Sequence, residues 1–323
     1  MKKWFSQLLG SPDGEDKSAG DAGATEDPAE QAAPGCIGGE IDAAYYRMLT
    51  ASAGFNAPRD VEDGILAEVQ ALAAQADVAA GLVPRVPDVI PQLLRSLQDD
   101  EVSPAELSRQ VGQDLVLVAE VIREANSAYY RPMTPVKTVE AAVMMLGQNG
   151  LRMLLARIAF RPVIKMQADG FTRRAAPQVW NQSEKCALAA SLLAPGLSAG
   201  VFESYLAGLM QNVGLVVAFR LADRVCEDGK VPGSSEFGIR LLAGSRLLSA
   251  AIARHWEFPP EVADAIGQAN DGRLAQALAM GDRIAKLRLL LDAGALSGDD
   301  TLVTGGLDAF QRRCLGKLAN MDG

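Results

Sequence analysis

The 323-residue chain carries a formal charge of −9, and only 5% of its residues are aromatic. A chain of this length can bury a sizeable core, and its Ala- and Leu-rich composition favours helices packed on helices. Its acidity argues against a broad nucleic-acid footprint, which needs concentrated Lys and Arg. Four widely spaced cysteines without a C-x-x-C pair, and no recognisable cleavable signal peptide, lead us to expect free thiols and a cytoplasmic location.

Residues 1–40 have the composition of an acidic arm. The segment MKKWFSQLLG is a short basic-amphipathic head, either a frayed terminus or a weak docking element for a membrane surface or a partner. Residues 11–40 carry eight acidic residues and one lysine, interspersed with Pro, Gly and Ala. Such a segment cannot offset its ordering entropy by burial, so we predict that residues 1–40 are disordered.

Helical spacing of apolar residues begins at Ile41. It predicts two lead-in helices, within residues 41–51 and 61–75, and then a proline-punctuated segment with a helix that ends at Leu97. We therefore divide the remaining chain into a helical lead-in, a main domain and a C-terminal helical extension. Their predicted ranges are 41–83, 84–292 and 293–323.

Residues 103–126 carry the clearest local signals. Ser103 suits an N-cap, Glu106 completes a capping box, Gly112 ends the helix, and Asp114 can cap the next one. The spacing is that of a helix-turn-helix, but the second helix is mostly Val, Leu and Ile. Two arginines against four acids give the segment a net charge of −2. Because a recognition helix needs donors for bases and phosphates, we interpret the pair as packed core helices.

Helical patterns continue to the C-terminal end. Thr138 opens VEAAVMMLG, with Gly147 at a C-terminal cap position. No convincing strand pattern or internal repeat occurs, so the predicted fold class is all-α. The most membrane-like stretch, residues 186–202, contains Pro195 and is short for a span, so we expect no transmembrane segment. The other predicted helical segments are 149–160, 176–194, 201–224, 236–255, 260–270, 273–291 and 306–319.

His255 is the only histidine in the chain. A three-histidine zinc site and a histidine-aspartate phosphohydrolase cluster are therefore excluded. A Ser/His/Asp triad is not excluded by counting, but the sequence has no nucleophile elbow. We interpret His255, which precedes Trp256 at the end of a predicted helix, as a helix-terminal or packing residue.

Two amides, Gln211 and Asn212, stand in the middle of the apolar run GLMQNVG. Burying an amide costs free energy unless a neighbour hydrogen-bonds it. The pair is either exposed on a helix surface or part of a buried hydrogen-bond network.

An ordered set of motifs resembles the HDOD family, the output-domain relatives of the HD phosphohydrolases. The first motifs are VIPQLLRSLQDDEVSPAELSRQVGQDLVLVAEVIREANSAYY and VKTVEAAVMMLGQNGLRMLL. They are followed by VWNQSEKCALAA, YLAGLMQNVGLVV, ARHWEFPPEVADAI and ALAMGDRIAKL. The resemblance covers about residues 84–292 and implies a multi-helix HD-like domain.

The resemblance implies a degenerate metal site. In catalytic relatives a His-Asp doublet stands where this chain has Gln211 and Asn212. Gln182 corresponds to a further histidine position and Ser245, in a looser alignment, to a third, whereas Asp282 matches the retained closing aspartate. One carboxylate with neutral amides compensates a di-cation poorly, so we expect a buried hydrogen-bond network with no metal and no cofactor.

The glycines and the EANSAYY segment are interpreted as structural. Asn126 can adopt a left-handed cap conformation, and the tyrosines after Ser127 can pack the following turn. Gly208 and Gly214 bound the segment that holds the amide pair.

The resemblance implies a non-catalytic regulatory or scaffolding module in bacterial signal transduction. Its expected partners are signalling proteins with kinase, receiver or cyclic-di-nucleotide modules, and no nucleic acid. The alternatives are a small-molecule (nucleotide) sensor that uses the vestigial pocket and, less favoured, a residual phosphohydrolase with a rebuilt site that includes His255. The partner, the ligand, the pathway and the oligomeric state stay open.

Overall fold

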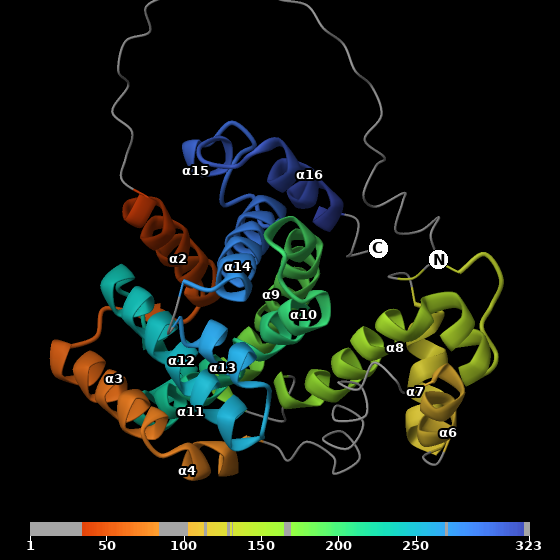
Figure 1. Ribbon diagram of the computed structural model, residues 1–323. Coiled ribbons are helices and arrows are strands. Elements are labelled where there is room, and N and C mark those ends of the chain that lie inside the picture. Colours follow the sequence, from red (N-terminus) through yellow and green to blue (C-terminus); the bar gives the residue numbers. More distant parts are fainter. Residues whose placement is uncertain are drawn as a thin grey trace, which may run out of the picture.

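The computed structural model describes residues 34–83, 103–112, 115–127, 130, 132–164, 169–268 and 271–319 (Figure 1). Three helices form the lead-in: α2 (Pro34–Thr50), α3 (Arg59–Ala73) and α4 (Ala76–Gly81). Helix α2 begins inside the range 1–40, which the sequence predicted as a disordered arm. The rest of that arm and the predicted helix that ends at Leu97 lie outside the described residues.

A two-residue strand pair joins the lead-in to a distant part of the chain. Strand β1 (Gly54–Phe55) runs parallel to β2 (Val231–Pro232), with Gly54 opposite Val231. Segments this short have no alternating pattern, so the sequence did not predict them. The fold is otherwise helical throughout the described ranges, as the predicted all-α class requires.

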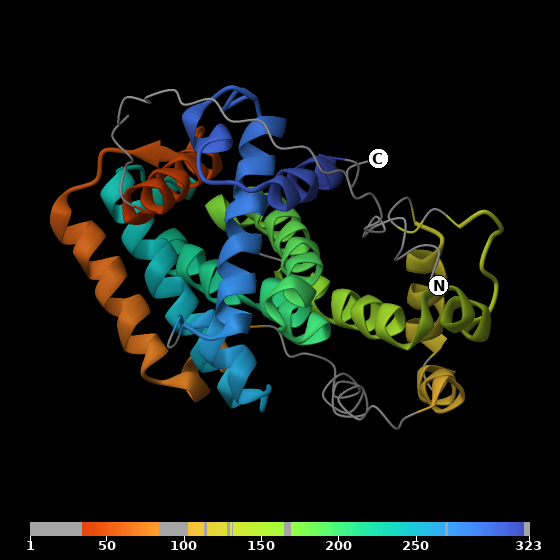
Figure 2. The same cartoon turned by 45° about the horizontal axis from the view of Figure 1, so that its top comes forward.

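Helices α6 (Pro104–Gly112) and α7 (Leu115–Ala125) pack on each other and on α8 (Val139–Ile164). Together with the first part of α8 they form a lobe at one side of the molecule, and α8 runs from this lobe into the body (Figures 1 and 2). The Ser103 Oγ accepts from the amide of Glu106 at 3.2 Å, which confirms the predicted N-cap. The two helices are core helices, as expected from their apolar sequence.

The course of α8 changes at Gly147, whose φ of 68° and ψ of −179° are not helical. A positive φ of this kind is accessible to glycine at little cost. The predicted helix end at Gly147 is therefore confirmed, although a second helical stretch follows at once.

The body consists of helices that pack around the longest one in its centre, α9 (Gly170–Leu193). Helix α9 contacts α10, α11 and α14, while α12 covers α2, α3 and α11. Two 3-10 turns, η1 (Ala194–Leu197) and η2 (Glu227–Gly229), connect some of these helices. The remaining body helices are α10 (Val201–Met210), α11 (Val213–Val225), α12 (Ser235–His255), α13 (Pro260–Ile266) and α14 (Arg273–Asp292).

The C-terminal extension consists of α15 (Thr301–Thr304) and α16 (Ala309–Leu318). Asp308 caps α16 with a complete capping box that includes Gln311. Helix α16 packs on α14 and α9, and Cys314, Leu315 and Leu318 are buried there.

The main core is continuous from the lead-in to α14, and a second, smaller core lies between α2, α9, α14 and α16. Tyr45 and Tyr46 of α2 are fully buried, and Tyr46 donates through its hydroxyl to the Pro232 carbonyl at 2.7 Å. The lead-in and the extension are thus packed into the domain rather than appended to it. This packing brings α2 to the candidate site.

One stretch of the described residues, Val201–Val225, is long and apolar enough to cross a membrane, but its apolar 18-residue window is 94% buried inside the protein. It also changes helix at residues 211–212, between α10 and α11. We therefore assign the stretch to two helices of the protein core.

Candidate functional site

Gln211 and Asn212 lie in the turn between α10 and α11, not inside one helix as the apolar pattern predicted. Gly208 and Gly214 on either side allow the close approach of neighbouring helices. A Cβ on Gly208 would lie 2.4 Å from the Cα of Ala187 in α9, and one on Gly214 would lie 2.2 Å from the Ser245 carbonyl in α12. The turn therefore packs closely between α9 and α12, and the side chains of Gln211 and Asn212 are buried.

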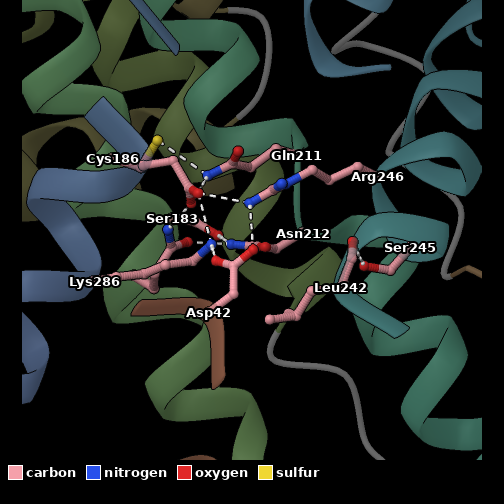
Figure 3. A network of polar contacts seen from close by, with 11 residues as sticks. Asp42, Ser183, Cys186, Gln211, Asn212, Leu242, Ser245, Arg246 and Lys286 are labelled. Carbon is pink, nitrogen blue, oxygen red and sulfur yellow. Dashed lines mark hydrogen bonds and ion pairs between the residues drawn. The ribbon is translucent and has the colours of Figure 1, made fainter. Parts of the chain in front are cut away.

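The amides form one hydrogen-bond network (Figure 3). Asn212 Nδ2 donates to Gln182 Oε1 and, at 2.9 Å, to Ser183 Oγ. Gln182 Nε2 donates at 2.6 Å to Asp282 Oδ1, which also accepts from Gln211 Nε2 at 3.0 Å. The interpretation of Gln211 and Asn212 as an exposed pair is therefore wrong, and the network offsets the cost of burying them.

The second oxygen of Asp282 is held by two cations. Its Oδ2 accepts from Arg246 at 2.7 Å and from Lys286 Nζ at 2.6 Å. Burial alone would raise the pKa of Asp282, but the Lys286 and Arg246 charges and the hydrogen bonds hold it below its ordinary value. Asp282 is therefore an ionised carboxylate, and each of its oxygens already accepts two hydrogen bonds.

A second carboxylate reaches the same cations from the lead-in. Asp42 of α2 accepts from Lys286 Nζ at 2.6 Å and lies 3.8 Å from Arg246 (Figure 3). Two acids and two bases thus form a neutral group, which we call the site cluster: Asp42, Arg246, Asp282 and Lys286. The pKa of Arg246 is raised because the attraction of Asp282 and Asp42 exceeds the effect of burial, which lowers it. The expectation that Asp282 is the one anionic group left in the site is wrong.

Two further side chains border the cluster. Gln211 Nε2 also donates to Cys186 Sγ at 3.0 Å, and burial raises the pKa of that thiol. Tyr45 is fully buried, its hydroxyl has no hydrogen-bond partner, and Lys286 Nζ lies 5.6 Å from its ring centroid. The free cysteines Cys186, Cys226 and Cys314 are all buried.

The structure brings together Gln182, Gln211, Asn212 and Asp282 but leaves Ser245 outside the network. The Ser245 hydroxyl donates to the Leu242 carbonyl at 2.8 Å, within its own helix. Arg246, the next residue of α12, lies on a different face of the helix, and its guanidinium donates to Asp282 instead. Sequence reasoning missed Arg246, although it follows Ser245 directly, and Lys286, although it lies one helical turn after Asp282.

The space inside the site is small. A cavity of about 10 Å³ is bordered by Gln211, Arg246, Gln268 and Asp282. That volume suits about one water molecule, whereas small-molecule sites typically enclose about 300–1,000 Å³. In this conformation the site does not admit a nucleotide.

A larger hollow of about 680 Å³ lies elsewhere on the body, beside residues 169–170 and 220–229. Its Asp223 carboxylate accepts from the amides of Phe171 at 2.7 Å and Thr172 at 2.9 Å. These contacts cap the start of α9, so the Asp223 carboxylate has a structural role there.

A metal ion does not fit the residues of the site. Among the described residues, no group of three or more His, Cys, Asp or Glu side chains could hold a metal ion. All four hydrogen-bonding positions of the Asp282 carboxylate are occupied, and Arg246 and Lys286 place positive charge beside it. A divalent cation would have to displace both cations and would be repelled by them.

His255 is not a member of the site cluster. It is the last residue of α12, and its side chain is exposed. The interpretation as a helix-terminal residue agrees with this position.

A second group of charges links the lobe to the body. Glu124 of α7 accepts from Arg157 and, at 2.8 Å, from Arg161, both in α8, and Arg157 also donates to Glu184 of α9. We call Glu124, Arg157, Arg161 and Glu184 the junction cluster. Glu184 directly follows Ser183, which accepts from Asn212, so the junction cluster and the amide network are adjacent along α9.

Asn126, two residues after Glu124, does not adopt the predicted left-handed conformation, since it is absent from the positive-φ residues of the described chain. Its side chain instead bridges a loop. Nδ2 donates to the carbonyls of Ile122 at 2.7 Å and Val136 at 2.8 Å, and Oδ1 accepts from the Val136 amide at 2.8 Å. An asparagine can make this donor-and-acceptor pair without a positive φ. Asn126 therefore holds the connection between α7 and α8, whereas the Ser127 hydroxyl is buried without a hydrogen-bond partner among the described residues.

The order of helices and the degenerate amide-aspartate site are those expected for one family. The profile of the HDOD domain matches residues 83–271, more than half of the chain. This chain belongs to the HDOD family. That family is related to the HD phosphohydrolases.

One curated relative, an uncharacterized protein of Treponema pallidum (strain Nichols), is 26% identical over 219 residues. The match covers 65% of this chain but 41% of that relative, so the chain spans less than half of its length.

Solved structures of bacterial proteins share the fold of this HDOD protein. An HDOD domain protein of unknown function from Geobacter sulfurreducens has a TM-score of 0.54 and 21% identity, over 77% of this chain and 93% of that one. A "Putative metal-dependent phosphohydrolase" from Shewanella amazonensis SB2B has a TM-score of 0.53 and 19% identity, over 80% and 99%. A "Putative signal transduction protein" from Marinobacter aquaeolei VT8 has a TM-score of 0.51 and 19% identity, over 88% and 66%. At these identities the likeness concerns the fold alone.

Proposed function

We propose that this HDOD protein is a non-catalytic regulatory module of bacterial signal transduction that acts through protein–protein contacts. The observation that carries the proposal is the placement of Arg246 and Lys286 on Asp282. In a metal-dependent relative this aspartate would bind a cation that is free to exchange ligands. Here the positive charge belongs to two side chains, which cannot activate water or coordinate a phosphoryl oxygen as a metal does.

A phosphohydrolase mechanism needs a nucleophile and an acid or base near the reacting phosphate. The site cluster offers Asp282, an ionised carboxylate whose lone pairs are occupied, Asp42, which is paired with Lys286, and two cations that are already paired. His255, the one histidine, lies exposed at the end of α12. The composition of the site therefore favours a structural use of the vestigial pocket.

The cavity of about 10 Å³ also disfavours a nucleotide sensor in this conformation. Protein contacts remain as the means of regulation, and the fold offers surfaces on a lobe that is joined to the body through α8 (Figure 2). The partners that fit the proposal are signalling proteins with kinase, receiver or cyclic-di-nucleotide modules. The fold neighbour from Marinobacter aquaeolei, named as a signal transduction protein, supports a signalling role.

Metal analysis of the purified chain tests the proposal directly. After expression in medium supplemented with Mn, Fe and Zn, we expect well below one transition-metal ion per chain and no hydrolysis of phosphomonoesters or cyclic di-nucleotides. One tightly held metal ion per chain that is lost in Asp282→Ala would overturn the proposal. Affinity capture from the native organism, with Arg157→Met as a matched variant, then tests whether a signalling protein binds the intact lobe and body.

A further inference from the structure

Asp42 enters the site from outside the part of the chain that defines the family. The HDOD profile matches residues 83–271, whereas Asp42 lies in the lead-in helix α2. Its carboxylate contacts both cations of the site, Lys286 at 2.6 Å and Arg246 at 3.8 Å. A side chain of the lead-in thus completes the charge balance of the domain.

Without the Asp42 carboxylate, the site would have an unbalanced positive charge. Arg246, Lys286 and Asp282 together carry a net charge of +1, and Lys286 is almost fully buried. Lys286 Nζ also lies 5.6 Å from the ring centroid of the buried Tyr45, so this cation is shielded from solvent on that side. Two neighbouring cations in a desolvated pocket are what a small oxyanion needs.

The first turns of α2, before Asp42, contain Gly38 and Gly39, whereas Ile41 directly before Asp42 is buried in the second core. Both glycines lie one turn before Asp42, and a Cβ built on either would have nothing within 4 Å. Packing therefore does not require glycine at these positions, and glycine lowers the stability of the first turns. The second half of α2 is firmly anchored by Tyr46, whose hydroxyl binds the Pro232 carbonyl and whose ring leaves no room for a Cβ on Gly238.

We propose that Asp42 is an internal occupant of an oxyanion subsite formed by Arg246 and Lys286, and that the first half of α2 closes this subsite. The ligand class is a small oxyanion such as a phosphate group, which would take the place of the Asp42 carboxylate. The inference rests on the proposed function, because a site that holds its own cations can bind phosphate without a metal. The contact of Asp42 is then autoinhibitory.

The test measures binding of inorganic phosphate to full-length variants by thermal shift and calorimetry, in EDTA and at constant ionic strength. We expect Asp42→Ala to bind phosphate saturably, with a Kd at least about tenfold lower than that of the wild-type chain. Asp42→Asn, which keeps the size of the side chain and removes its charge, changes affinity in the same direction. Adding Lys286→Met to Asp42→Ala abolishes the gain.

Asp63→Ala is the matched control, since Asp63 forms an exposed ion pair with Arg240 at 3.1 Å and its loss changes the net charge equally. Unchanged phosphate affinity in folded Asp42→Ala and Asp42→Asn would overturn the inference, and so would an equal gain in Asp63→Ala. Failure of both Asp42 variants to fold would also overturn it, because no free anion could then replace the carboxylate. Metal or hydrolase activity in the wild-type chain would instead overturn the proposed function, and EDTA keeps the two results separate.

Discussion

The site cluster and the junction cluster each contain two acids and two bases, but they join different parts of the molecule. The site cluster connects α2, α12 and α14, three helices that also share apolar cores. The junction cluster connects α7 of the lobe with α8 and α9, and one of its members, Arg161, is 39% exposed. The first cluster is enclosed within packed helices, whereas the second lies where two parts of the fold meet.

The two clusters should therefore control different properties: the site cluster the stability of the fold, and the junction cluster the orientation of the lobe. Charges enclosed on all sides are destabilising once a partner is lost, because the remaining charge stays desolvated. In the junction cluster Arg161 retains access to water and keeps Glu124 paired, so the loss of one member costs less and acts on how the lobe is held. We therefore expect changes in the site cluster to lower global stability, and changes in the junction cluster to loosen the lobe.

The largest effect is expected for Asp282→Ala. The substitution leaves two cations with Asp42 alone and removes the acceptor of the Gln182 and Gln211 amides. We expect a loss of about 3–5 kcal/mol in the free energy of unfolding, measured by urea denaturation. Asp63→Ala, which removes an exposed pair, should cost less than about 1 kcal/mol. Equal losses in the two variants would contradict the enclosed character of the site cluster.

Acid should weaken the site cluster by protonating Asp282. Its pKa in the folded protein is lower than its ordinary value, so the unfolded chain takes up a proton first as pH falls. The stabilisation is fully present above the ordinary aspartate pKa of about 3.9 and is lost as pH falls through the lower folded value. In Asp282→Asn the part of the pH dependence below about pH 4 should diminish. An unchanged acid profile in that variant would show that other carboxylates determine it.

Arg157→Met should loosen the junction. Two carboxylates, Glu124 and Glu184, would lose their shared partner, and both side chains are at most 15% exposed. Because Arg161 remains paired with Glu124, we expect a smaller loss of about 2–3 kcal/mol. Hydrogen exchange should increase in α6 and α7 more than in α9. An equal increase of hydrogen exchange in all helices of the body would mean that the junction cluster stabilises the whole core instead.

Much of the fold could be predicted because helix signals are local. The Ser103 cap and the break at Gly147 depend on neighbouring residues, and both are present. The break between α10 and α11 was missed, since the apolar pattern runs through Gln211 and Asn212 without a proline. There the long-range hydrogen bonds to α9 and α14 determine the backbone.

The site was predictable only in part for the same reason. The resemblance to the family identified the amides and Asp282 as candidate site residues. Asp42 is 240 residues before Asp282 in sequence, and no local pattern distinguishes it from the other acids of the lead-in. Arg246 and Lys286 have ordinary helical contexts, so their role follows only from the packing of α12 and α14 on α2.

The smallest of these effects is expected for Asn212→Asp, which restores the ancestral acid without its metal. Asn212 Nδ2 donates to Gln182 Oε1 and Ser183 Oγ, and an ionised aspartate would instead place an oxygen against Gln182 Oε1. We expect a loss of about 1–3 kcal/mol in the free energy of unfolding at neutral pH. Asn56→Asp, at an exposed loop position, is the matched control and should be nearly neutral.

The pH dependence of Asn212→Asp distinguishes a lost donor from a packing defect. A carboxylic acid at position 212 is more easily protonated in the folded chain than in the unfolded one, because burial and the facing acceptor raise its pKa. The protonated form donates again to Gln182 Oε1, so the loss relative to wild type should shrink as pH falls from 7 to about 5. A loss that stays constant over this range would mean that the donor to Gln182 contributes little. Full stability together with a newly bound metal ion would show instead that Arg246 and Lys286 can leave Asp282.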